Sequence, residues 1–170
     1  MQKSVLANVA ENVLRYGPKA MAKPLAIVPF SVKARVIEKI LDQLMAQQIA
    51  DEELDFLKQR WVKIEIQDMN LSFEVSFENR FKVREQGDAE VTFSAPTKEL
   101  VLIAAAKEDP DTLFFQRKLA IEGDTELGLE VKNLLLSIEF DAMPKVVRQS
   151  IEHLANLLLQ LQRQVDAKWV

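Results

Sequence analysis

WVKIEIQDMNLSFEVSFE, residues 61–78, alternates between apolar and polar side chains over most of its length. A period of two predicts β-strands with one buried face and one wet face, which is typical of antiparallel sheets rather than of parallel sheets covered on both sides. The same alternation returns in RFKVRE, residues 80–85, and in EVTFSA, residues 90–95. Short polar segments separate these strands, so we expect consecutive strands to pair as a meander.

The segments before and after these strands have apolar residues at helical spacing. Ser31 can cap a helix that runs to about Ala50. Thr97 can cap a second helix, which has Leu100 and Ile103 on its apolar side. Helices before and after a run of alternating strands favour an α+β fold.

Three further elements follow. Pro110 suits the first position of a short helix that Asp109 caps, and RKLAIEG, residues 117–123, predicts a last strand. Pro144 opens a long C-terminal helix whose apolar stripe consists of Val147, Ile151, Leu154, Leu158, Leu161 and Val165. The predicted fold is therefore a sheet of about five mostly antiparallel strands, with helices over its single apolar face.

The segment after Gly123 predicts a helix that is apolar on two sides. One stripe consists of Leu127, Val131, Leu134, Leu135 and Ile138, and the second of Leu129, Leu136 and Phe140. We expect such a helix to be covered on both sides, by the sheet and by a neighbouring helix or a ligand. Gly128 inside it costs about 1 kcal/mol relative to alanine. This cost should be offset either by a close approach of the helix to the sheet or by the space that glycine leaves for the chain of a bound ligand.

The composition excludes several kinds of site. The chain has no cysteine and one histidine, His153, so disulfides and thiolate chemistry are excluded and a tetrahedral zinc site lacks its usual ligands. No run of about 18 apolar residues predicts a transmembrane helix, and the N-terminus does not resemble a secretory signal. We therefore expect the protein in the cytoplasm.

The net charge of −4 is unevenly distributed. The first 39 residues carry seven basic and two acidic side chains, whereas residues 40–143 carry 11 basic and 22 acidic ones. An acidic body repels nucleic acid, so we expect no nucleic-acid partner.

Five acids near Gly123 invite a catalytic interpretation: Asp109, Asp111, Glu122, Asp124 and Glu126. Asp109 and Asp124 each precede a predicted helix, where a carboxylate accepts hydrogen bonds from free backbone N–H groups and contributes about 0.5–2 kcal/mol. The chain has no phosphate-binding loop of the G-x-x-x-x-G-K type. We interpret the acids as structural and predict no catalytic residue, no metal and no cofactor, with His153 as a surface or partly packed residue.

Residues 1–30 form a separate N-terminal arm. It begins as an amphipathic helix, but Gly17, Pro18, Pro24 and Pro29 should interrupt it. Two alternatives remain open. The arm packs on the domain, or its basic and apolar residues contact an anionic membrane surface.

A long run of specific residues carries a family resemblance. ELDFLKQRWVKIEIQDMNLSFEVSF, residues 53–77, and FSAPTKELVLIAAAKEDPDTLFFQRKLAIEGDTELGLEVKNLLLSIE, residues 93–139, resemble the sterol carrier protein 2 (SCP2) domain superfamily. The second run is most similar to the bacterial SCP2-domain accessory factors of ubiquinone biosynthesis. The resemblance divides the chain into the arm at 1–30, an SCP2-like lipid-binding domain at 31–140 and a C-terminal helix at 141–170.

The resemblance implies a non-enzymatic lipid binder in the oxygen-independent branch of ubiquinone synthesis. It would hold a lipid with a polyprenyl or acyl tail and present it to partners such as the UbiU–UbiV hydroxylation proteins, at the inner membrane. An apolar tunnel would be lined by Phe73, Val75, Val91, Phe93, Leu100, Ile103, Phe114, Leu127, Val131, Leu134, Leu135 and Ile138.

A different class of function remains open beside this one. The same fold with a filled interior could serve as a scaffold, with the C-terminal helix docking partner proteins or a second copy as a homodimer. The size of the interior discriminates the two, because only a lipid binder needs an apolar cavity.

Overall fold

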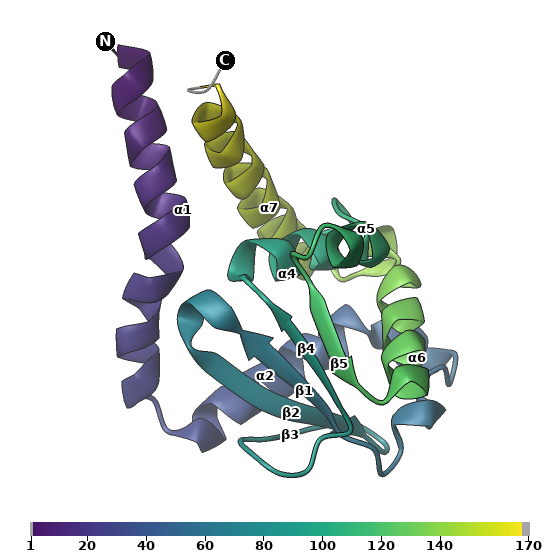
Figure 1. Ribbon diagram of the computed structural model, residues 1–170. Helices are drawn as coiled ribbons and strands as arrows, with labels where there is room; N and C mark the ends of the chain where they lie inside the picture. The colour runs from purple at the N-terminus through teal and green to yellow at the C-terminus, as the bar shows by residue number, and fades with distance from the viewer. Residues whose placement is uncertain (1, 168–170) are drawn as a thin grey trace.

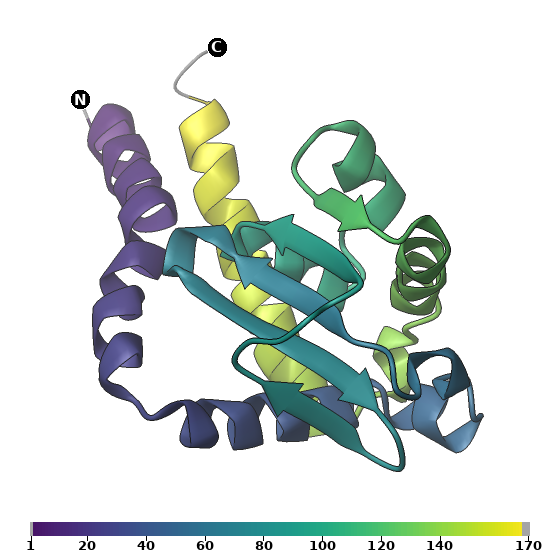
Figure 2. The same cartoon turned by 60° about the horizontal axis from the view of Figure 1, so that its bottom comes forward.

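The computed structural model describes residues 2–167, with side chains from residue 5 onward, residue 142 excepted (Figure 1). Residues 1 and 168–170, at the outer ends of the expected arm and C-terminal helix, lie outside this range. A five-stranded sheet forms the centre, and Figure 2 shows it in front with α7 (Lys145–Asp166) passing behind. The predicted α+β architecture is confirmed.

The sheet has the strand order β3-β2-β1-β4-β5. Its strands are β1 (Val62–Ile66), β2 (Leu71–Phe77), β3 (Phe81–Arg84), β4 (Val91–Ala95) and β5 (Ala120–Gly123). Only the β1–β4 pair is parallel, and the other three pairs are antiparallel. About five strands in a mostly antiparallel sheet were expected, and the structure confirms them.

The expected meander is correct for β1 to β3 but wrong for β4, which crosses over to pair with β1. The outer edge of β3 is already occupied by helix α2 (Phe30–Leu44). The Glu38 carboxylate accepts a hydrogen bond from the Val83 N–H at 3.0 Å, and Asp42 accepts one from the Phe81 N–H at 3.4 Å. Because these carboxylates already accept hydrogen bonds from the edge of β3, β4 pairs with the free edge of β1 instead.

Helices cover the apolar face of the sheet. After α2 come α3 (Ala46–Ala50), α4 (Thr97–Ala104), α5 (Pro110–Phe115) and α6 (Thr125–Leu136), with short 3₁₀ turns η1 (Asp55–Leu57), η2 (Gln67–Met69) and η3 (Phe140–Ala142). The inward strand residues Phe73, Val75, Val91 and Phe93 are buried beneath them. The large apolar side chains of both layers thus meet in one core.

Two expected helix caps are wrong. Pro29, not Ser31, precedes the first residue of α2, and the single helix expected to about Ala50 is divided at Met45. Thr97 is the first residue of α4 rather than its cap, and its N–H and Oγ1 both donate to Asp68, at 2.8 and 2.7 Å. A carboxylate distant in sequence therefore takes the capping role, which local sequence does not reveal.

The N-terminal arm is helix α1 (Gln2–Ile27), which lies beside α7 (Figure 1). The expected interruptions at Gly17, Pro18 and Pro24 are wrong, since the helix continues through them and ends before Pro29. Ala7 and Ala10 are buried, which allows close packing. This packing offsets the hydrogen bonds that the two internal prolines cannot make.

Candidate functional site

An apolar cavity of about 240 Å³ lies between the sheet and helices α2, α4 and α6. The helices contribute Leu41 and Leu44 from α2, Leu100 and Ala104 from α4, and Val131 from α6. Every described residue that lines it is aliphatic, aromatic or methionine. A hollow of this kind excludes charged groups and favours an apolar guest.

The structure brings nine of the twelve expected tunnel residues to this cavity: Phe73, Val75, Phe93, Leu100, Ile103, Val131, Leu134, Leu135 and Ile138. The other three are not among its lining residues. Val91 and Leu127 are fully buried in the core beside it. Phe114 is 40% exposed on α5, where its ring meets that of Phe115 edge-on.

Sequence reasoning missed further residues that line the cavity: Leu41, Leu44, Met45, Leu57, Val62, Ile64, Ile66, Phe81, Ala104 and Leu119. The signal for several of them was present, because strand alternation already places Val62, Ile64 and Ile66 on the inward face. Met45 follows Leu41 by four residues in the helix expected to about Ala50, whereas Leu57 lies in the short 3₁₀ turn η1, where no periodic signal existed.

Helix α6 forms one wall of the cavity, and the position of this helix depends on two glycines. Gly123 has φ +117°, and a Cβ there would lie 2.4 Å from the Glu90 carbonyl oxygen. A Cβ on Gly128 would lie 3.2 Å from Ile121 Cγ2 and 3.4 Å from Val91 Cγ2. Of the two explanations for Gly128, close approach to the sheet is the one that the structure shows.

The expected second covered stripe of α6 is wrong. Leu129 is 52% exposed and Leu136 is 48% exposed, so the described chain covers only about half of each side chain on this side. The helix ends at Leu136, so Phe140 lies outside it, in η3. An apolar stripe indicates that a helix face favours burial, but the face is buried only if another element packs against it.

Two of the five acids around Gly123 cap helices, as expected from their positions. Asp109 caps α5 by accepting from the Asp111 N–H at 2.8 Å, and Asp124 caps α6 by accepting from the Leu127 N–H at 2.7 Å. Asp111 also pairs with Lys132 at 2.6 Å. Among the residues that the structure describes, no three His, Asp or Glu side chains gather as a metal-binding group.

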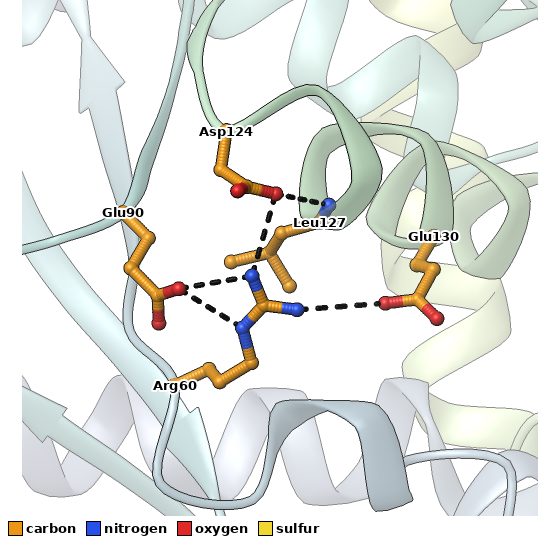
Figure 3. Close-up of polar contacts among 5 residues, drawn as sticks. All are labelled: Arg60, Glu90, Asp124, Leu127 and Glu130. Atoms are coloured by element: carbon orange, nitrogen blue, oxygen red, sulfur yellow. Dashed lines mark hydrogen bonds and ion pairs between the residues drawn. The ribbon is translucent and has the colours of Figure 1, made fainter.

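Arg60 joins the start of α6 to the sheet, an arrangement that the sequence did not reveal (Figure 3). Its guanidinium donates to Glu90 Oε2 at 2.9 and 3.0 Å, and lies 3.3 Å from Asp124 and 3.9 Å from Glu130. The hydrogen bonds to Glu90 raise the pKa of Arg60, with further contributions from the charges of Glu90 and Asp124. The cluster fixes the N-terminus of α6, and hence one cavity wall.

The outer face of the sheet carries its own paired charges. Glu74 is buried and accepts from Arg84 Nε at 2.6 Å and from the Gly87 N–H at 3.0 Å. The hydrogen bond from Lys63 and then the one from Ser94 lower the pKa of Glu65. These acids are satisfied by fixed donors, so they form a structural network.

Several apolar side chains of α1 and α7 remain exposed, including Val5, Leu6 and Val9 of α1 and Leu154 and Leu157 of α7. Within residues 2–167, no helix has the length and hydropathy needed to cross a bilayer.

Comparison with known proteins agrees with this geometry. The SCP-2 sterol transfer family matches residues 37–136. The ubiquinone biosynthesis accessory factor UbiT of Escherichia coli strain K12 is 42% identical over 155 residues, which cover 91% of this chain and 89% of that protein, and the protein of the same name from Escherichia coli O157:H7 matches equally.

A solved structure shows the same fold. The UbiJ-SCP2 ubiquinone synthesis protein superposes with a TM-score of 0.53 at 20% identity, covering 65% of this chain and 100% of that one. The family match spans the sheet and the helices that enclose the cavity. The chain therefore belongs to the SCP-2 sterol transfer family and, within it, to the relatives of the ubiquinone biosynthesis accessory factor UbiT.

Proposed function

We propose that this protein is a non-catalytic lipid-binding accessory factor of ubiquinone biosynthesis, which holds a polyprenyl quinone precursor or another lipid by its apolar tail for partner enzymes. The observation that carries this proposal is the cavity, which is lined by apolar residues alone in the part of the chain that the structure describes. The relationship to UbiT supports the pathway.

The physical basis of the proposal is the cost of exposing a tail to water. Burial of apolar surface contributes about 25 cal/mol per Å². A prenylated or acylated precursor would leave a membrane only if a protein offered an equivalent apolar environment. The inward faces of β1, β2 and β4 supply one wall of that environment, and α2, α4 and α6 supply the others.

The size of the cavity limits what it can hold in this conformation. Its 240 Å³ is slightly below the range of about 300–1,000 Å³ that is typical of ligand pockets. It would therefore enclose a segment of a long tail, unless the helices move apart.

The finer assignments rest on the family resemblance. We propose that the protein acts in the oxygen-independent branch, with UbiU–UbiV as partners, in the cytoplasm and peripherally at the inner membrane. Contact through the N-terminal arm is supported by the exposed Val5, Leu6 and Val9 of α1 and by basic Arg15 and Lys19 on the same helix. A homodimer is a further proposal, which the exposed leucines of α7 support.

Transfer from vesicles tests the proposed function. Lipid-free protein is mixed with vesicles that contain a polyprenylated phenol, the vesicles are removed by flotation, and the lipid in the protein fraction is measured by mass spectrometry. We expect the polyprenylated phenol in the protein fraction, and no retention of the same phenol without its tail, because the cavity offers apolar contacts alone. A protein fraction without lipid would count against the proposal.

A further inference from the structure

A second hollow, of about 400 Å³, lies at the surface where α4 ends and α5 begins. We call it the vestibule. Its lining residues come from the end of α4, the following loop, the first residue of α5, the end of α6 and the segment after α6: Ile103, Ala106, Lys107, Glu108, Asp109, Pro110, Leu135, Leu136 and Ile138.

The vestibule adjoins the apolar cavity. Ile103, Leu135 and Ile138 line both hollows, so these three side chains form the boundary between them. A molecule that extends past this boundary would have one part in the cavity and the other in the vestibule.

The two hollows differ in chemistry. The cavity has only apolar side chains among its described lining residues, so a hydroxyl or carboxylate inside it would lose its hydrogen bonds to water and gain none. The vestibule contains Lys107, Glu108 and Asp109. A tailed lipid with a polar head therefore has one favourable orientation, with its head in the vestibule.

The polar side of the vestibule is held in a defined shape. Ala106 has φ +51°, and its N–H donates to the Ile103 carbonyl at 2.9 Å. The Lys107 N–H donates to the Leu102 carbonyl at 2.9 Å, and Asp109 is fixed as the cap of α5. The turn that closes α4 thus places these polar residues at the boundary of the cavity.

Lys107 has its ammonium group available for a ligand. The residue is exposed, and its ammonium group makes no hydrogen bond or ion pair with any residue that the structure describes. By contrast, Asp109 is engaged by the Asp111 N–H, and Asp111 is paired with Lys132. An ammonium group donates to oxygen atoms, which favours a head that carries hydroxyl or carboxylate oxygens.

We propose that the vestibule is the headgroup subsite of the bound lipid, where Lys107 donates to a phenolic or carboxylate oxygen while the tail passes Ile103, Leu135 and Ile138 into the cavity. This inference rests on the proposed function and adds the orientation of the guest to it. The reactive ring would then remain at the surface, accessible to an enzyme, while the tail is enclosed.

Two spin-labelled stearic acids test the orientation, one with the nitroxide next to the carboxylate and one with it near the methyl end. Each is added to isotopically labelled full-length protein, and the broadening of amide NMR signals is recorded. We expect the first probe to broaden Ala106 and Lys107, and the second to broaden Val75 and Phe93, which lie in the strands behind the cavity. The reverse pattern would overturn the orientation while leaving lipid binding intact.

A charge reversal tests the role of Lys107. We expect Lys107→Glu to weaken binding of unlabelled stearate about two- to fivefold, the range of an exposed ion pair, and Lys118→Glu, an exposed lysine outside the vestibule, to leave it unchanged. Equal weakening by both variants, or none by either, would overturn the assignment of Lys107. If neither spin-labelled probe binds at all, the proposed function fails and the inference fails with it.

Discussion

Gly123→Ala is expected to destabilise the protein by about 3 kcal/mol. Gly123 has φ +117°, where an L side chain is strained, and the added Cβ would lie 2.4 Å from the Glu90 carbonyl oxygen and 3.0 Å from Val91 Cα. Both contacts are with backbone atoms, so no side-chain rotation relieves them. Urea unfolding followed by circular dichroism gives the free energy of unfolding directly.

The same turn explains why the loss should be large. The Asp124 N–H donates to the Glu90 carbonyl at 2.8 Å, and the Asp124 carboxylate both caps α6 and pairs with Arg60 (Figure 3). Moving the Gly123 backbone away from Glu90 would strain all of these contacts together.

Two control variants bracket the effect of Gly123→Ala. Asp124→Ala removes the cap but leaves the backbone path unchanged, so it should cost about 1 kcal/mol. Gly17→Ala, inside α1, should stabilise the protein by about 0.5–1 kcal/mol, because alanine favours the helix and the added Cβ would lie 4.0 Å from Val13 Cγ1. A Gly123→Ala protein as stable as Gly17→Ala would contradict the proposed strain.

Ala104→Phe is expected to reduce lipid uptake from vesicles by about tenfold or more, equivalent to about 1.4 kcal/mol of binding free energy. Ala104 ends α4 and lines the cavity, so a phenyl group at this position would occupy space that the tail needs. Because the hollow accepts part of the ring, the cost in stability should stay within about 1–3 kcal/mol. Uptake and the free energy of unfolding are measured on the same preparation.

Ala50→Phe is the matched control for Ala104→Phe. It makes the same chemical change at an exposed position at the end of α3, outside the lining of the cavity. We expect uptake by Ala50→Phe to equal that of the unchanged protein. A folded Ala104→Phe variant with undiminished uptake would show that lipid is held elsewhere.

The local elements could be predicted because their signals lie in neighbouring residues. Alternation placed Val62, Phe73 and Phe93 on one face, and the structure buries all three. Asp109 and Asp124 were identified as caps from their positions alone, because a cap depends only on the next three residues.

The missed features depend on contacts between distant residues. The crossover of β4 follows from Glu38 and Asp42, which occupy the edge of β3. The Arg60 cluster joins residues that are 30 and more positions apart, and no pattern within one segment indicates it. Continuity of α1 through Pro18 likewise depends on packing against α7.

The lining of the cavity was predictable only in part, for the same reason. Residues such as Ile103 and Leu134 were found because inward faces of regular elements are periodic. Phe114 was expected inside but lies on a short helix, where six residues give too little periodicity to assign a face.

The most direct measurement is the identification of the lipids that co-purify with the protein. Full-length protein is purified without detergent, extracted with organic solvent, and the extract is analysed by mass spectrometry beside that of Ala104→Phe prepared in parallel. If the cavity encloses the tail of a lipid, the extract of the unchanged protein should contain a tailed lipid, and the extract of Ala104→Phe should contain less of it. Extracts that are equally free of lipid, from protein that also takes up none from vesicles, would contradict the account.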